Sequence, residues 1–217
     1  MNTSLPRLCF LIAALSPVFS FAATPLVIET FDEPTGKTYT FPPKNDWKDH
    51  LRGRLSGWSG DGAVAITYGE GLGKGDTGGI KVELARAGSD FAFAKLQLAV
   101  LGFTKGKVTA EQVKNLVLVF DIRGNQPLKI FTTAQTTLKD SWPSRIELNT
   151  ITLTPKWTTV RFPLSNAKPD EIGRFVEAIN QSEAANIVVM FYLAGFSGWQ
   201  EKDAFQLDNV GFESATD

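Results

Sequence analysis

The sequence is poor in the residues that most often carry catalysis and metal binding. It contains one cysteine, Cys9, and one histidine, His50. These counts exclude a disulfide within the chain, Cys-His catalysis and a histidine-rich zinc site. His50 follows the charged stretch that begins at Asp46, a context typical of a surface residue rather than of a general base. We therefore expect a protein that is not an enzyme.

The chain also lacks an excess of either charge. It has 22 basic and 23 acidic residues, a formal net charge of -1, and its lysines are scattered. Nucleic acids and anionic membranes attract proteins through basic patches, which this balance does not supply. We expect neither as a partner.

The apolar run at the N-terminus is too short to cross a membrane. It spans residues 8–21, is broken by Pro17 and follows the single positive charge of Arg7. A spanning helix needs roughly 20 apolar residues. Ser20 and Ala22 place small residues where a signal peptidase requires them. The sequence thus predicts a signal peptide over residues 1–22, a single domain over 23–217, a periplasmic or secreted location, and no membrane span after cleavage.

Strand signals dominate the rest of the chain. Ten segments rich in Val, Ile, Thr and Phe are bounded by turn-forming residues: 26–31, 63–68, 80–84, 91–101, 115–122, 128–134, 145–153, 157–164, 186–194 and 204–212. Within 157–164, alternation predicts Val160 and Phe162 on a buried face with Thr159 and Arg161 outside. Residues 116–120 are apolar on both faces, which predicts a central strand.

Helix signals are few. Pro169, Asp170 and Glu171 are typical of a helix start, and apolar residues then recur at helical spacing until Asn180. Thr109 to Gln112 is a candidate cap for one further short turn. Many strands with one substantial helix predict an all-β fold, an antiparallel β-sandwich of the jelly-roll type.

Four segments come in an order that resembles a known superfamily. They are Ile28-Glu29-Thr30-Phe31-Asp32-Glu33, the strand from Gly79 to Leu84, the strand from Lys156 to Leu164, and the closing Phe205-Gln206-Leu207-Asp208-Asn209-Val210-Gly211-Phe212. This order resembles the galactose-binding-like jelly-roll superfamily, in particular carbohydrate-binding modules similar to family 11. The resemblance implies a polysaccharide or oligosaccharide ligand. The superfamily also includes the complex I intermediate-associated proteins, so an assembly or protein-interaction factor is the alternative function.

Aromatic residues supply the candidate ligand site. A flat aromatic ring stacks on the apolar face of a sugar, while nearby polar groups bind the hydroxyls. Trp58, Trp142 and Trp199 lie in turn-like polar contexts, where we expect exposed rings, and Tyr68 and Tyr192 are further candidates. Trp157 begins an alternating strand, and we expect it in the core.

The resemblance also implies a structural calcium ion between the first and last strands. Glu29 or Asp32 would approach Asp208 there, together with the loop from Lys74 to Thr77. Converging carboxylates and carbonyl oxygens are the ligands that Ca²⁺ requires. Solvated charges at a strand edge are the alternative interpretation for Glu29 and Asp32.

A polysaccharide lyase of jelly-roll fold is a further alternative. The stretch Arg145-Ile146-Glu147-Leu148 and the stretch from Tyr192 to Gln200 resemble two motifs of alginate lyases. The third motif, a Gln-x-His strand, is missing, and the spacing is too short. We therefore rank a lyase below both binding functions.

Overall fold

The computed structural model describes residues 25–32, 38–41, 55–59, 62–87, 92–138, 141–148, 150–194 and 198–215. For strands β2 and β3 the structure describes the backbone and not the side chains. The predicted signal peptide over residues 1–22 and the predicted surface residue His50 lie outside the described residues.

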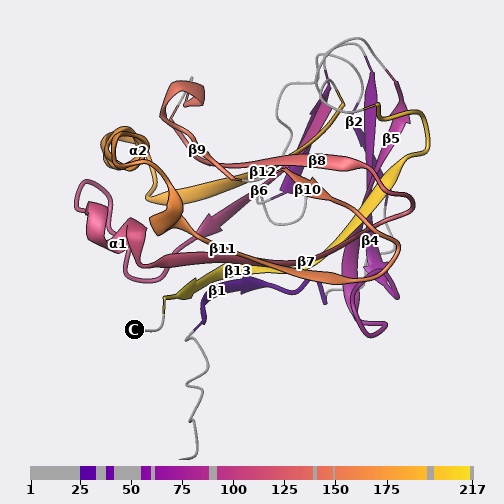
Figure 1. The fold of residues 1–217 in the computed structure, drawn as a ribbon, viewed down its shortest axis with the longest axis horizontal. Helices are drawn as coiled ribbons and strands as arrows, with labels where there is room; N and C mark the ends of the chain where they lie inside the picture. Colours follow the sequence, from indigo (N-terminus) through magenta and orange to yellow (C-terminus); the bar gives the residue numbers. More distant parts are fainter. Residues whose placement is uncertain are drawn as a thin grey trace, which may run out of the picture.

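The described strands form two antiparallel sheets that face each other (Figure 1). The first sheet has the spatial order β11 (Thr158–Pro163), β7 (Leu116–Gly124), β13 (Ala204–Ser214), β5 (Gly78–Arg86), β4 (Ala63–Glu70) and β2 (Thr38–Phe41), and β1 (Pro25–Glu29) also pairs with β13. The second sheet has the order β10 (Ile151–Thr152), β8 (Lys129–Thr136), β12 (Asn186–Ala194), β6 (Ala92–Ala99) and β3 (Leu55–Ser59), and β9 (Ile146–Glu147) also pairs with β8. The predicted all-β sandwich is confirmed.

The main core lies between the two sheets. Along β5, Ile80, Val82 and Leu84 are fully buried, whereas Lys81 between them points to the outside of the first sheet. Phe120 of β7 and Phe191 of β12 meet edge to face with ring centroids 5.3 Å apart, and so join the two sheets. Burial of each such side chain contributes about 1.5–3 kcal/mol, which is the main favourable term of a fold without disulfides.

The predicted helix is confirmed as α2 (Pro169–Gln181), which buries Ile172, Phe175 and Ile179. The shorter α1 (Ala110–Lys114) begins with a capping box, in which Thr109 and Gln112 bond to each other's backbone. Figure 1 shows both helices at one end of the sandwich. Neither helix of the described chain has the length and the apolar character to span a bilayer.

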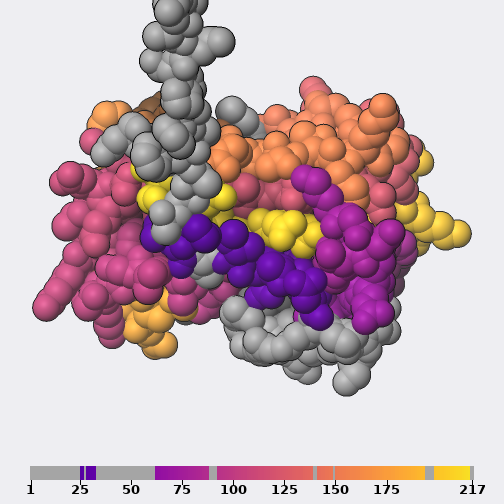
Figure 2. Space-filling view, turned by 90° about the horizontal axis from the view of Figure 1, so that it is seen from below, coloured from indigo at the N-terminus to yellow at the C-terminus, as the bar shows by residue number. Residues whose placement is uncertain are grey.

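The last strand changes its partner halfway along. Residues 204–207 of β13 pair with β5, and residues 210–213 pair with β1 on the same flank. A bulge lies between Asp208 and Gly211, where Asn209 has a φ of 50°. Figure 2 shows the yellow last strand directly beside the indigo first strand. The implied pairing of first and last strands is thus confirmed, and it places Asp208 at the junction of β1 and β5.

Two details differ from the sequence-based expectation, and a third agrees with it. The segment 145–153 is two short strands, β9 and β10, both paired with β8. Strands β2 and β3 were not predicted, because β2 has only four residues and β3 contains Ser56, Gly57 and Ser59, a composition typical of turns. The alternation in β11 is confirmed: Val160 and Phe162 are half-buried, and Thr159 and Arg161 are exposed.

Candidate functional site

The outer face of the second sheet carries a cleft and a second apolar cluster. Along β12, Val189 and Phe191 point into the main core, so Val188, Met190 and Tyr192 point away from it. These three form a separate cluster with Phe93 of β6, against which Phe131 packs. A cleft of about 540 Å³ lies over this cluster. We call it the aromatic cleft, and its lining includes Phe93, Lys95, Gln97, Gln135, Trp142 and Tyr192.

Tyr192 lies at the centre of the aromatic side chains of the cleft. Strand register places it opposite Phe93 on one side and Phe131 on the other. Its ring centroid is 5.3 Å from that of Phe93, 5.7 Å from that of Phe131 and 5.9 Å from that of Trp142. Because these rings surround it, Tyr192 is only 4% exposed and forms the floor of the cleft.

Trp142 is the exposed aromatic of the cleft. It begins the short 3₁₀ turn η1 (Trp142–Ser144), is 44% exposed, and meets Tyr192 at an interplanar angle of 77°. The guanidinium of Arg145 covers its ring, with Cζ 3.8 Å from the centroid. Arg145 also donates to the Trp142 carbonyl at 2.9 Å and pairs with Glu147. The expectation that Trp142 is exposed is confirmed.

The turn that carries Trp142 is held in place by α2. Arg174 of α2 donates a hydrogen bond from Nε to the Pro143 carbonyl, at 3.2 Å. Ser144 donates to the Ser141 carbonyl at 2.9 Å within the turn itself. Figure 1 shows α2 beside the segment that leads into β9. The turn that carries the exposed ring is therefore held by one hydrogen bond from α2 and by one within the turn.

A buried polar network fixes the phenol of Tyr192. Gln135 donates from Nε2 to the Tyr192 hydroxyl and to Thr133 Oγ1, each at 3.0 Å, and accepts from Ser141 Oγ at 3.2 Å. Burial raises the pKa of the Tyr192 phenol above its ordinary value of 10.0, against the opposing effect of these hydrogen bonds and of the Arg145 charge. Tyr192 therefore stays neutral near pH 7 and serves as a hydrogen-bonding ring.

Lys95 and Gln97 bring polar groups to the other side of the cleft. They follow Phe93 at every second position of β6, so the three side chains share one face at intervals of roughly 6.8 Å. Register places Lys95 opposite Met190 and Gln97 opposite Val188. Across β12 from Gln97 lies Gln135. The cleft thus combines aromatic rings with the amide groups of Gln97 and Gln135 and the ammonium group of Lys95.

Trp58 occupies a register position at the edge of the same sheet. Strand β3 pairs Trp58 with Phe93 of β6, which in turn is paired with Tyr192. The side chain of Trp58 lies outside the described structure. Its proposed ligand contact therefore stays a prediction.

The expectation of an exposed ring was wrong for Trp199. It is 7% exposed, packs edge to face on Phe205 with centroids 6.1 Å apart, and donates from Nε1 to the Lys129 carbonyl at 2.8 Å. The turn context was read correctly, since Gly198 before it has a φ of 71°. The indole folds inward because it gains both apolar burial and a backbone acceptor there.

Tyr68 is also buried and lies away from the cleft. It belongs to β4 of the first sheet, is 4% exposed, and packs edge to face against Phe31 in the main core. Its side chain points inward, since it shares the face of Val64 and Ile66, which are also in the core. Tyr68 does not line the aromatic cleft, and its suggested role in ligand contact stays a prediction.

The sequence pattern missed several cleft residues. Phe93, Met190 and Gln135, which line the cleft, were not proposed as contributors to the site. A signal was present in β12, where the run from Val188 to Tyr192 is apolar at consecutive positions and therefore on both faces of the sheet. A strand whose outer face is apolar needs a cover or a ligand.

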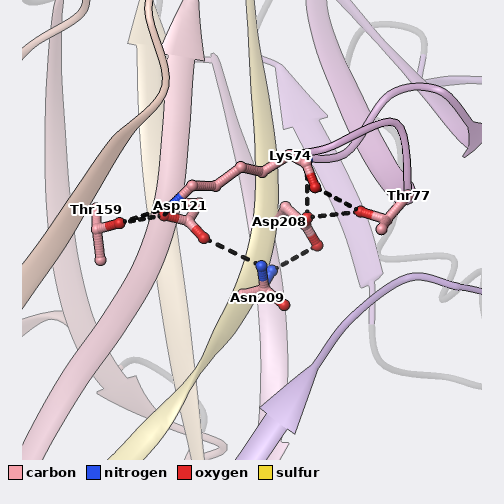
Figure 3. A network of polar contacts seen from close by, with 6 residues as sticks. All are labelled: Lys74, Thr77, Asp121, Thr159, Asp208 and Asn209. Carbon is pink, nitrogen blue, oxygen red and sulfur yellow. Dashed lines mark hydrogen bonds and ion pairs between the residues drawn. The ribbon is translucent and has the colours of Figure 1, made fainter.

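A second polar cluster surrounds Asp208 (Figure 3). Asp208 is 1% exposed and accepts from the backbone N–H of Lys74 at 2.9 Å, from Thr77 Oγ1 at 3.1 Å and from the backbone N–H of Asn209 at 2.7 Å. Its register partner on β7 is Asp121. The loop from Lys74 to Thr77 thus reaches the last strand, as the sequence analysis expected.

Asp121 has a different set of partners in this network. Lys74 Nζ lies 2.8 Å from Asp121 Oδ1, Asn209 Nδ2 donates to Oδ2 at 3.0 Å, and Thr159 donates from Oγ1. Burial acts to raise the pKa of Asp121, but the hydrogen bonds from Lys74, Thr159 and Asn209 outweigh it and lower that pKa. Burial raises the pKa of Asp208, and the charge of Asp121 adds to that rise.

The predicted calcium ligands do not converge. Among the described residues, no three Asp, Glu, His or Cys side chains form a group that could hold a metal ion. Asp32 accepts from the Gly78 N–H at 3.2 Å, and Glu29 accepts from the Phe31 N–H at 3.3 Å. The Asp208 carboxylate already accepts from two backbone N–H groups and from the Thr77 hydroxyl, and a cation would have to displace these donors. These residues do not fit a Ca²⁺ site in this arrangement, and calcium binding itself stays a prediction.

Comparisons with known proteins gave similar solved structures only. No protein-family model matches the chain, and the search of curated proteins found no match. The family 11 carbohydrate-binding module of the cellulosomal cellulase Lic26A-Cel5E of Clostridium thermocellum is 15% identical, with 89% of this chain and 98% of that chain covered and a TM-score of 0.48.

Two further structures are similar at the same level. A family 11 module from Clostridium thermocellum, solved in complex with a β-1,3-1,4-mixed-linked tetrasaccharide, is 17% identical, with coverage of 76% and 91% and a TM-score of 0.46. The N-terminal cellulose-binding domain of β-1,4-glucanase C from Cellulomonas fimi is 15% identical, with coverage of 90% and 99% and a TM-score of 0.46.

Proposed function

We propose that this protein is an exported, non-catalytic carbohydrate-binding protein that holds a polysaccharide or oligosaccharide segment in the aromatic cleft. The observation that carries the proposal is Trp142. Its indole is 44% exposed at the cleft, is backed by Arg145 and stands against the ring of Tyr192. A rigidly mounted indole of this kind offers a flat apolar surface without further ordering of the side chain.

Sugar binding suits this combination of groups. A pyranose ring presents axial C–H groups on one face, which gain dispersion and lose water against an indole. Its equatorial hydroxyls need hydrogen-bonding partners nearby, and Gln97 and Lys95 line the cleft opposite the aromatic row. Gln135 already bonds to Ser141, Thr133 and Tyr192, so its role is to position the floor.

The size of the cleft supports an oligosaccharide rather than a flat protein partner. About 540 Å³ lies within the range of 300–1,000 Å³ that is typical of small-molecule sites. The net charge of -1 gives no long-range attraction to a charged polymer. Affinity should therefore come from stacking and hydrogen bonds, and should change little with salt.

Export is the part of the proposal that rests on the N-terminal sequence. Arg7, the apolar run over residues 8–21, and the small residues Ser20 and Ala22 together are typical of a cleaved signal peptide. Intact mass of the protein recovered from the periplasm or medium should correspond to a chain that begins at Ala23. Recovery of a chain that retains residues 1–21 would refute this part.

The binding experiment is a glycan array on the mature protein, followed by calorimetric titration of the best soluble glycan. Trp142→Ala should lower the affinity by about 30-fold, which corresponds to roughly 2 kcal/mol for a central stacking residue. Leu101→Ala is the matched control, because Leu101 is an exposed apolar residue, 71% accessible, that does not line the cleft. The control should bind as the wild type does.

Two outcomes would contradict the proposal. One is the absence of binding to every glycan on the array by folded protein. The other is full affinity of folded Trp142→Ala for the glycan that the wild type binds. In either case the alternative function, an assembly or protein-interaction factor of the same fold, takes its place.

A further inference from the structure

A second, smaller pocket lies on the outer side of the first sheet. Its volume is about 220 Å³, and its lining includes Lys81, Arg123, Asn125, Phe205 and Gln206. Register places Gln206 of β13 between Lys81 of β5 and Arg123 of β7. Their neighbours in each strand, such as Val82 and Ile122, belong to the main core, so these polar side chains point outward. We call it the Arg123 pocket.

Arg123 is held in one orientation by two different contacts. Its Nε donates to Gln206 Oε1 at 2.7 Å, and its Cζ lies 4.8 Å from the centroid of the Trp157 ring. Gln206 is itself fixed, since its Nε2 donates to the Leu72 carbonyl at 3.0 Å. Trp157 was expected in the core, but it is half-buried beneath the guanidinium. The plane of the guanidinium is thus preorganised before any ligand arrives.

The terminal nitrogens of Arg123 are available for a ligand. Within the described residues they have no hydrogen-bond or ion-pair partner, since the one hydrogen bond of the guanidinium there is donated by Nε. A guanidinium that presents two parallel N–H groups matches the two oxygens of a carboxylate or of a sulfate group. This arrangement is that of a binding group rather than of a satisfied ion pair.

The acidic side chains near the pocket already have cations of their own. Glu83 pairs with Lys81, and Asp121, two residues before Arg123 on β7, pairs with Lys74. Arg123 itself has no carboxylate partner among the described residues. An anion placed against Arg123 would gain a charge-assisted, bidentate hydrogen bond at a site where Lys81 lies across the pocket.

We propose that the Arg123 pocket binds an oxyanion, the carboxylate or sulfate group of a small acidic ligand. The volume of about 220 Å³ is below the 300–1,000 Å³ of sites for drug-sized ligands, which limits the occupant to a single small group or one sugar unit. Trp157 backs the guanidinium, and Lys81, which is paired with Glu83, lines the same pocket. The site lies on the opposite sheet from the aromatic cleft and does not depend on it.

The test is an NMR titration of the full mature chain that follows the Arg123 Nε–H and Trp157 Nε1–H signals, assigned with Arg123→Lys and Trp157→Phe. The titrants are sodium glucuronate for a carboxylate source, sodium sulfate for a sulfate source, glucose for a neutral sugar, and sodium chloride at matched ionic strength. We expect a saturable shift with glucuronate, with sulfate or with both, and none with glucose or chloride. The tighter of the two anions identifies the source.

Substitutions make the test specific to Arg123. Arg123→Lys keeps the positive charge but loses the two parallel N–H groups of the guanidinium, and should weaken anion binding at least tenfold. Lys81→Gln leaves Arg123 intact and should weaken anion binding severalfold. Arg161→Lys is the matched control on the same sheet, where Arg161 pairs with Glu213, and Trp142→Ala is the control for the aromatic cleft. Both controls should bind the anion within twofold of the wild type.

The proposal is overturned if neither anion gives a saturable shift beyond that of chloride. It is equally overturned if Arg123→Lys and Lys81→Gln both bind as tightly as the wild type. Loss of glycan binding in Trp142→Ala with unchanged anion binding separates this site from the proposed function. Failure of the glycan experiment leaves the anion titration as an independent result.

Discussion

The guanidinium of Arg145 lies over the indole of Trp142, with 3.8 Å between Cζ and the ring centroid. One side of the only exposed tryptophan side chain among the described residues is therefore already covered by the protein. The same guanidinium is tied to Glu147 and to the Trp142 carbonyl. These contacts fix the orientation of the indole ring at the cleft.

Removal of the Arg145 charge should loosen Trp142 and weaken glycan binding. A cation–π contact at an exposed site contributes about 0.5–1 kcal/mol, so Arg145→Met should lower glycan affinity roughly twofold to fivefold. Glu147→Gln keeps the guanidinium and should change affinity less, because an exposed ion pair contributes little. Calorimetric titration measures both variants. Wild-type affinity in Arg145→Met would show that the contact does not position the ring.

Trp199→Ala should affect stability rather than ligand binding. Trp199 is buried against Phe205 and bonded to the Lys129 carbonyl, so its truncation should cost about 3–5 kcal/mol of unfolding free energy. Trp142→Ala, at an exposed ring, should cost much less. Urea unfolding of both variants checks the stability, and titration at low temperature checks the glycan affinity of the folded Trp199→Ala. If Trp199→Ala lost more glycan affinity than Trp142→Ala, Trp199 would have to contact the ligand after all.

The sequence was informative where local patterns decide structure. Segments rich in Val, Ile, Thr and Phe with turn-forming boundaries placed most strands. Period-two alternation gave the orientation of Val160 and Phe162, and the start at Pro169 with its apolar spacing placed α2. These features depend on neighbours within a few residues. The β-sandwich follows from them, because many short strands with one substantial helix have few other ways to bury their apolar faces.

The candidate site was predicted less well, since it depends on contacts between distant segments. Trp142 and Trp199 have similar polar, turn-like contexts, yet one ring is 44% exposed and the other 7%. The difference lies in what each ring meets: Arg145 at the surface for Trp142, and Phe205 inside for Trp199. The pairing of Lys74 with Asp121 likewise requires the register of β7 and β13, which no local pattern records.

The calcium prediction can be tested without a glycan. If Ca²⁺ binds beside Asp208, a chelator should lower the melting temperature, since an ion at 100 times its dissociation constant stabilises by about 2.7 kcal/mol. Binding would have to displace the donors of Lys74 and Thr77 that now bond to Asp208. Asp208→Asn should abolish the chelator effect. An unchanged melting curve in chelator ends the calcium prediction.

The two buried aspartates should give the protein opposite responses to acid. The pKa of Asp121 is lowered in the folded state, so its ionised form contributes stability that is present above the ordinary value of 3.8 and is lost as the pH falls below it. The pKa of Asp208 is raised, so its contribution is present below 3.8 and is lost as the pH rises through the folded-state pKa. The two effects therefore occupy different pH ranges.

Urea unfolding of the wild type, Asp121→Asn and Asp208→Asn between pH 3 and pH 7 separates these effects. The difference in unfolding free energy between the wild type and Asp121→Asn should stay constant from pH 7 to about pH 4 and shrink below it. The difference in unfolding free energy between the wild type and Asp208→Asn should instead change above about pH 4. In that range the wild type gains stability on acidification and the variant does not. Lys74→Met should reduce the pH dependence of the unfolding free energy below pH 4, as Asp121→Asn does. The reason is that the Lys74 ammonium holds the Asp121 carboxylate ionised. Parallel curves for all four proteins would show that the network in Figure 3 does not couple folding to the charge of either aspartate.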